Sequence, residues 1–339
     1  MKKLALLLIG LLIAPTLFLT SCDRGDDISD GSAVSTPAFE TMKNYMVSNS
    51  MDIPNILTNA DGEKFVVGAP ATEDLQAFLD KYYIMDIRTA DAFNAGHIEG
   101  AKLVPFSNIL TEAENAGSKP ILVVCFSGQT ACYATALLRL YGYNHTRSLK
   151  WGMSGWNAAT AGPWNGKIGT DLANGNSNWS YSAAPTNIIF QDPTISSFST
   201  SGDVILKERI EAVVAEGFGA ATVTGSDVLN NPSNYFVNNY FSETDYSGFG
   251  HIANAYRINP VTLAGGEYLN LNPGSDAKVV TYCYTGQTSA VMTACLRVLG
   301  YDAYSMTFGM NGIYNTNTAW TSNQWGGDSN PKNLPLVTN

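Results

Sequence analysis

The sequence predicts an α/β protein in which one domain is present twice, each copy holding a parallel β-sheet flanked by helices. The first observation is a repeat, because Cys125-Phe-Ser-Gly-Gln-Thr130 matches Cys283-Tyr-Thr-Gly-Gln-Thr288, and identities continue at the same offset to Gly142 and Gly300. The second observation is that each motif follows a strand-like apolar run and precedes a helical pattern. Strands that alternate with helices favour a parallel sheet with right-handed crossovers.

The expected elements follow from local patterns. The run 121–125, Ile-Leu-Val-Val-Cys, predicts a strand buried on both faces of a sheet. Gly142 should end the helix after it, and Thr72 is the expected N-cap of an earlier helix. In the first copy we expect helices at 37–48, 72–79 and 129–141, and strands at 82–87, 102–104 and 121–125. In the second copy we expect helices at 204–215, 226–229 and 287–299, and strands at 235–238, 256–258 and 278–283.

The N-terminus has the pattern of an export signal. Lys2 and Lys3 precede an apolar run at 4–19, which is short for a membrane span and fits the core of a signal peptide. The run closes on Leu19-Thr-Ser-Cys22, which resembles the lipobox of bacterial lipoproteins, where the cysteine is lipidated and becomes the first residue. We therefore expect a cell-envelope protein that a lipid on Cys22 anchors to a membrane, facing the periplasm or the exterior. An uncleaved anchor helix is the alternative.

The length of 339 residues leaves room for two domains after the leader. We expect a signal peptide at 1–22, a linker at 23–36, domains at 37–165 and 201–330, and a second linker at 166–200. Solvated linkers seldom carry tryptophan, so the linker and tail segments should pack back onto their own domains through four such residues: Trp164, Trp179, Trp320 and Trp325. The net charge of −10 argues against a nucleic-acid partner.

The repeated motif places a cysteine where a strand gives way to a helix. Unpaired N–H groups and the positive end of the helix dipole favour the thiolate there, and the thiolate is the nucleophile. Gly128 and Gly286 allow the loop to curl its amides inward, and Thr130 and Thr288 can cap the helix or donate a hydroxyl to an anion. We expect no metal and no cofactor, because the chain has three histidines and no Cys/His cluster.

Three motifs together resemble the rhodanese family. They are Cys-x-x-Gly-x-Thr after a buried strand, Asp86-Ile-Arg88 followed by Gly96-His97-Ile98, and Gly-Met-x-Gly at 152–155 and 309–312. The resemblance implies a five-stranded parallel sheet wrapped by helices in each domain, and it implies transfer of sulfane sulfur through a cysteine persulfide. Cys125 and Cys283 carry over as the nucleophiles. The implied substrate-binding residues are Phe126, Ser127, Gly128, Gln129, Thr130, Tyr284, Thr285, Gly286, Gln287, Thr288 and Arg88.

The second copy departs from the family pattern. Asn238-Asn239-Tyr240 aligns with Asp-x-Arg, two extra residues precede His251, and Asn254 replaces Gly100. We therefore expect Cys125 to be the more dependable nucleophile. Neither loop carries Lys or Arg, so persulfides or polysulfide should suit the site as donors better than doubly charged thiosulfate. The acceptor would be a thiol or another nucleophile.

The same residues allow other functional interpretations. Phosphatases and arsenate reductases of related fold need Cys-x5-Arg, but Ala131 and Ser289 stand at the sixth position. A non-enzymatic sulfur carrier or binding module remains open. Cys132 and Cys295 are expected to be helix-packing residues, with a resolving role for Cys132 as the alternative. His97 and His251 are expected in structural turns, with a Cys–His dyad as the alternative.

The leader generates the first prediction. Cys22→Ala should release the protein from the membrane or stall it as the full-length precursor, because the lipid attachment atom is lost. Membrane fractionation with an immunoblot for precursor length measures this, and fractionation like that of the wild type would contradict it.

Overall fold

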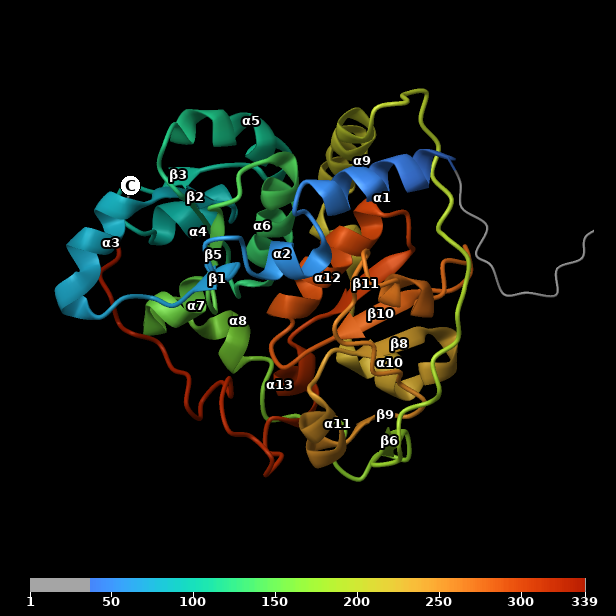
Figure 1. Cartoon of the computed structure of the whole chain (residues 1–339). Coiled ribbons are helices and arrows are strands. Elements are labelled where there is room, and N and C mark those ends of the chain that lie inside the picture. Colours follow the sequence, from blue (N-terminus) through green and yellow to red (C-terminus); the bar gives the residue numbers. More distant parts are fainter. Residues whose placement is uncertain (1–36, 339) are drawn as a thin grey trace, which may run out of the picture. The chain divides into compact units, whose positions relative to one another are not determined.

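Two parallel sheets carry the two copies of the repeat (Figure 1). The structure is a computed structural model that describes residues 37–338, so the lipobox-like segment ending at Cys22 lies outside the described residues. In spatial order, the first sheet consists of β1 (Val66–Val67), β5 (Arg147–Leu149), β4 (Ile121–Val124), β2 (Tyr83–Asp86) and β3 (Lys102–Leu103). The second consists of β7 (Thr222–Val223), β11 (Ala303–Met306), β10 (Val279–Tyr282) and β8 (Phe236–Asn239). A short antiparallel pair joins β6 (Trp179–Ser180) to β9 (His251–Ile252). The predicted parallel α/β architecture is confirmed.

Helices flank both sheets. The first copy contains α1 (Pro37–Ser48), α2 (Ile53–Leu57), α3 (Leu75–Lys81), α4 (Ala90–Ala95), α5 (Ile109–Ala113), α6 (Gln129–Tyr141), α7 (Met153–Trp156) and α8 (Gly162–Asn165). The second contains α9 (Gly202–Glu216), α10 (Gly225–Asn230), α11 (Glu243–Phe249), α12 (Gln287–Val298) and α13 (Gly309–Tyr314). Gly142 ends α6 with φ of 117°, as predicted. The N-cap prediction for Thr72 was wrong, because a 3-10 turn begins there and Ala71 precedes it without a side-chain cap.

The strand before the first motif is buried on both faces, as its apolar run predicted. Ile121 and Val123 belong to one core cluster, whereas Leu122 and Val124 belong to another on the opposite face of the sheet. Side chains alternate across a strand, so a central strand between two helical layers must be apolar at every position. This burial fixes the end of β4, and therefore the position of Cys125.

The second sheet has four strands where five were expected. The segment predicted as a strand at 256–258 makes a single parallel bridge, between Tyr256 and Asn238. Beyond that bridge the Asn238 side chain takes over the pairing: its Oδ1 accepts from the Ile258 amide at 2.9 Å and its Nδ2 donates to the Ile258 carbonyl at 3.2 Å. A side-chain amide thus satisfies the backbone groups that a fifth strand would have paired.

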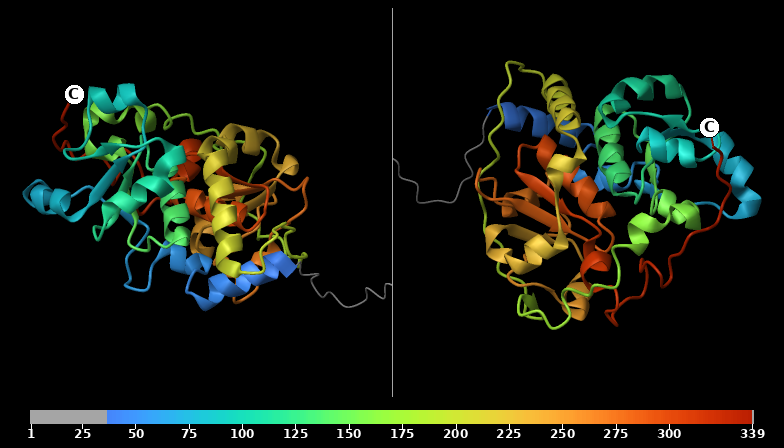
Figure 2. Two further views of the ribbon diagram at one scale, coloured as in Figure 1. Left: turned by 90° about the horizontal axis from the view of Figure 1, so that it is seen from above. Right: turned by 180° about the vertical axis from the view of Figure 1, so that it is seen from behind.

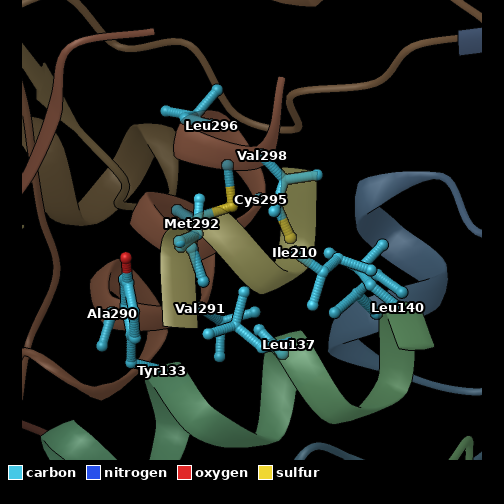
Figure 3. Close-up of a cluster of buried hydrophobic side chains, with 14 of the residues drawn as sticks. Tyr133, Leu137, Leu140, Ile210, Ala290, Val291, Met292, Cys295, Leu296 and Val298 are labelled. Carbon is cyan, nitrogen blue, oxygen red and sulfur yellow. The ribbon is translucent and has the colours of Figure 1, made fainter. Parts of the chain in front are cut away.

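The two copies share one hydrophobic core. Helices α6 and α12 pack along each other, and α9 lies against both. Cys295 and Leu137 occupy the same position in the repeat, and both lie in this interface (Figure 3). The side chains labelled in Figure 3 are Tyr133, Leu137, Leu140, Ile210, Ala290, Val291, Met292, Cys295, Leu296 and Val298. The described chain accordingly belongs to a single compact unit.

Each end of the described chain packs on the other copy. Figure 2 shows α1 lying against α9, and the Phe39 ring of α1 lies 5.8 Å from that of Tyr268. The C-terminal tail instead follows the first copy, where Val337 pairs with His97 and the Trp156 indole donates to the Pro335 carbonyl at 2.8 Å. The domain limits of 37–165 and 201–330 stay predictions. Helix α1 lies within the first range but packs on the second copy, and the C-terminal tail packs on the first copy.

Within residues 37–338, no helix combines the length and the apolar character needed to cross a bilayer.

Candidate active site

Both cysteines lie at the carboxyl end of a central strand and just before a helix. Cys125 follows β4 and precedes α6, and Cys283 follows β10 and precedes α12 in the same way. Gly128 and Gly286 are the N-cap residues, with φ of 88° and 74°. These left-handed conformations turn the loop back over the sulfur, and glycine adopts them without strain. The predicted loop geometry is therefore present twice.

Backbone amides surround the Cys125 sulfur. The amides of Gly128 and Ala131 donate to Sγ at 3.1 and 3.3 Å, and the Ser127 amide also stabilises the thiolate. Ala131 was not among the predicted cradle residues. Its amide is one of the unpaired N–H groups of the first helical turn, and that general rule was the signal that could have identified it.

Burial opposes the effect of these amides. The Cys125 side chain is 3% exposed. Desolvation of the thiolate raises the pKa of Cys125 above its ordinary value, the Asp86 charge raises it further, and the amides lower it without reversing the shift. The expected thiolate-stabilising geometry is present, but in this closed arrangement the neutral thiol is favoured.

The Cys283 sulfur has a sparser set of donors. The Ser289 amide donates to Sγ at 3.3 Å, and the Ser289 hydroxyl lies 3.7 Å away. That hydroxyl also lies 2.8 Å from the Ser305 hydroxyl of β11. Cys283 is 1% exposed. The two loops therefore share their backbone path but differ in how they hold the sulfur.

The Gly-Met-x-Gly motif braces each loop from the neighbouring strand. A Cβ at Gly152 would collide with the Cys125 carbonyl oxygen, and one at Gly309 with that of Cys283. The amides of Met153 and Met310 donate to those carbonyls at 2.8 and 2.9 Å. Glycine is required because this turn touches the active loop backbone to backbone.

Arg88 supports the first loop from below. Its guanidinium forms an ion pair with Asp86 at 2.6 Å, donates to the Gly96 carbonyl at 2.8 Å, and lies 5.7 Å from the Phe126 ring centre. The side chain is 2% exposed, and its bonds to Asp86 and Gly96 hold it beside Phe126 of the loop. Its substrate-binding role stays a prediction.

The second copy replaces this support by aromatic stacking. Register pairs Asp86 with Val124 and Asn239 with Tyr282, so Asn239 and Phe241 are the counterparts of Asp86 and Arg88. The sequence alignment was therefore wrong by one residue, and one extra residue precedes His251 instead of two.

Asn239 and Phe241 keep the local geometry that Asp86 and Arg88 provide in the first copy. Asn239 Oδ1 accepts from the Phe241 amide at 3.0 Å, as Asp86 does from Arg88. The Phe241 ring stacks on that of Tyr284 at 4.4 Å, where Arg88 lies under Phe126. Asn254 adopts φ of 61°, close to the 77° of Gly100, so that substitution also preserves the turn.

The remaining predicted cradle residues divide between rim and interior. Phe126 is 40% exposed at the rim, and the Tyr284 hydroxyl donates to Asp245. Ser127 Oγ accepts from Gln129 Nε2 at 3.0 Å, and Thr285 Oγ1 accepts from the Gln287 amide at 3.3 Å. Neither helix has a side-chain cap, so the capping role considered for Thr130 and Thr288 was wrong.

The other cysteines and two histidines serve packing. Cys132 is buried with Sγ 2.9 Å from Ser148 Oγ, and burial raises the pKa of Cys295 to about 12. His97 and His251 each lie with Nδ1 near a backbone carbonyl oxygen, at 2.9 and 3.3 Å, and stack on a neighbouring ring. These contacts match the structural roles expected for them.

An aromatic cluster covers the junction of the two loops. Trp164 is fully buried, donates to the Ser127 carbonyl at 3.0 Å, and meets Phe308 edge-on at 4.9 Å. Trp151 and Trp325 complete the cluster. Trp179 and Trp320 pack against the second copy, where both contact Phe249. All four tryptophans pack on the protein as predicted, but Trp325 of the C-terminal tail packs its ring on Trp151 and Trp164 of the first copy, so its expected packing on its own domain was wrong.

No three His, Cys, Asp or Glu side chains gather into a metal-binding group in the described part of the chain.

Comparison with known proteins gives the family. Residues 71–159 and 240–316 match the rhodanese-like domain. The chain is 35% identical over 79 residues to GlpE, a thiosulfate sulfurtransferase of Shewanella oneidensis, which covers 23% of this chain and 78% of the relative. The chain belongs to the rhodanese-like family. It is accordingly a sulfurtransferase of the rhodanese type.

The chain is also similar to other proteins. GlpE of Pseudomonas putida strain KT2440 is 36% identical over 76 residues, which covers 22% of this chain and 69% of that relative. Among solved structures, a thiosulfate sulfurtransferase from Pseudomonas aeruginosa matches 87% of this chain and 51% of its own, with 16% identity and a TM-score of 0.30.

The raised pKa of Cys125 predicts a pH dependence. Only the thiolate reacts, so the rate of Cys125 alkylation by iodoacetamide should rise steadily with pH and should not level off near neutrality. Peptide mass spectrometry across pH, with free cysteine as the reference thiol, measures this rate. If the alkylation rate of Cys125 levels off at a lower pH than the rate of free cysteine does, the amides outweigh burial, contrary to this account.

Proposed function

We propose that Cys125 and Cys283 each carry sulfane sulfur as a persulfide. The cysteine thiolate would attack the outer sulfur of a persulfide donor R–S–SH, forming Cys–S–SH and releasing R–S⁻. An acceptor thiolate would then attack that outer sulfur, forming a new persulfide and regenerating the cysteine thiolate. The observation that carries this proposal is the set of amides directed at the Cys125 sulfur, at 3.1 and 3.3 Å.

The amides suit the charge changes of this cycle. Negative charge lies on the cysteine sulfur before attack and again after transfer, and fixed backbone donors stabilise it without reorganisation. The neutral thiol has less need of them, so the amides favour the reactive form over the resting form. Burial has the opposite effect on the thiolate in the resting protein, because it raises the pKa of Cys125.

The donor that we favour is a persulfide or polysulfide. Neither loop carries a lysine or arginine, and Arg88 is occupied by Asp86 and by a backbone carbonyl. A dianion would therefore meet amides and hydroxyls at the loop itself. The relatives named as thiosulfate sulfurtransferases make thiosulfate the alternative donor for this chain.

We also propose that the protein is anchored to a membrane of the cell envelope through a lipid on Cys22 and faces the periplasm or the exterior. The basic start, the short apolar run and the small residues before Cys22 support this location. A periplasmic or exterior site would place sulfur transfer where thiols and polysulfide meet, outside the reducing cytosol.

Cysteine variants test the mechanism and rank the two domains. Cys125→Ser should remove most sulfurtransferase turnover, Cys283→Ser a smaller share, and the double variant all of it. The reason is that more amides hold Cys125 than Cys283. Cys132→Ser is the matched control. The sulfur of this buried cysteine contacts the Ser148 hydroxyl, so the residue should be dispensable for turnover.

Two outcomes of these assays would contradict the proposal. Full activity of Cys125→Ser with loss in Cys283→Ser would reverse the ranking, and activity in the double variant would exclude the persulfide mechanism. If the wild type takes up sulfur stoichiometrically but shows no turnover with any thiol acceptor, the protein is a sulfur carrier.

Donor preference is a separate prediction. Polysulfide or a small persulfide should give a higher kcat/KM than thiosulfate, on the order of tenfold or more, because the loops offer no charge-assisted hydrogen bond to a dianion. Side-by-side kinetics with one thiol acceptor measures the ratio. A higher kcat/KM with thiosulfate would show that amides and hydroxyls alone recognise the dianion.

A further inference from the structure

The Gln129 side chain leaves its own loop and enters the loop of the other copy. Gln129 is the first residue of α6, and its Nε2 donates within its own loop to Ser127 Oγ at 3.0 Å. Its Oε1 accepts from the Phe308 amide of the second copy at 2.7 Å. The side chain is 3% exposed, so water does not compete freely for this bond.

Phe308 belongs to the brace of the Cys283 loop. It directly precedes Gly309, which lies against the Cys283 carbonyl, and Met310, whose amide donates to that carbonyl. Phe308 has φ of 61°, a left-handed conformation that a bulky residue adopts only when its surroundings hold it. Gln129 supplies a hydrogen bond at that strained position.

The same oxygen also touches the cap of α12. A Cβ at Gly286 would collide with Gln129 Oε1, and Gly286 is the residue that turns the Cys283 loop into the helix. One amide oxygen from the first domain therefore contacts both the brace and the turn that define the second active loop.

The equivalent residue of the second copy does not make the matching contact with the first copy. Gln287 is the counterpart of Gln129 and is equally buried, yet its Nε2 has no hydrogen-bond partner among the described residues. In the first copy, Trp164 anchors the loop by donating to the Ser127 carbonyl. Both loops are thus braced from within their own copies, and the second loop receives in addition the Gln129 contact from the first copy.

We infer that Gln129 is a positioning residue for Cys283, so that the first domain sets the reactivity of the second active site. This inference deepens the proposed function and rests on it for the persulfide readout alone. It assigns Gln129 a role different from the substrate-binding role that family resemblance implied, because both ends of its amide are occupied by the protein.

The test compares Gln129→Ala, Gln129→Met and Gln129→Glu in the full chain. For each variant, peptide mass spectrometry measures the iodoacetamide alkylation rate of Cys283 and its persulfide yield with polysulfide. Loss of the acceptor in the Ala and Met variants should lower persulfide formation at Cys283 on the order of tenfold or more and change its alkylation rate. Gln129→Glu keeps an acceptor oxygen and should restore most of both. Tyr133→Phe, which removes a buried hydroxyl without a partner in the described chain, should leave Cys283 unchanged.

The outcomes separate this inference from the proposed function. Gln129→Met keeps the side-chain volume, so it serves as the test if Gln129→Ala fails to fold. An unchanged alkylation rate and persulfide yield at Cys283 in Gln129→Met would overturn the inference. An equal loss in Gln129→Glu would also overturn it, since the acceptor would then be irrelevant. If the wild type forms no persulfide at Cys283, the proposed function fails there, and the alkylation rates alone still decide the role of Gln129.

Discussion

The structure depends on burying a sulfur atom where a strand ends and a helix begins. A thiolate loses hydration at that point, and backbone amides of the following turn are the groups available to replace it. Gly128 turns the chain so that amides face the Cys125 sulfur, and Gly152 lets the next turn approach the loop from the other side. The two effects oppose each other, because burial raises the pKa of Cys125 and the amides lower it.

Duplication gives two such sites with unequal support. Under the first loop lies the buried Asp86–Arg88 ion pair, whose guanidinium faces Phe126. Under the second loop, Asn239 keeps the turn and Phe241 keeps the stacking, without the charges. The first loop has a charged pair beside it and the second does not, so the two sites should differ in electrostatics more than in shape. The shared core of α6 and α12 then binds the two loops into one structure.

The sequence was sufficient for the features that depend on short-range patterns. The repeat predicted two sites, the apolar run predicted the buried strand β4, and Gly142 predicted the end of α6. Features set by the third dimension were missed. Asn238 pairs through its side chain where a fifth strand was expected, and the two ends of the described chain pack on the opposite copies. Ala131 contributes a backbone amide, which its side chain does not indicate. The one-residue error at Asn239 arose because Asn238 and Asn239 look alike in sequence, while strand register separates them.

The central claim is that two buried cysteines in one chain both accept sulfur. The most direct measurement is mass spectrometry of the purified wild-type protein after brief exposure to polysulfide and removal of excess donor. The account predicts an added mass of two sulfur atoms per chain, one located on the peptide of Cys125 and one on that of Cys283, both removed by a reducing thiol. Added sulfur located on Cys132 or Cys295, or no added sulfur on either Cys125 or Cys283, would contradict it.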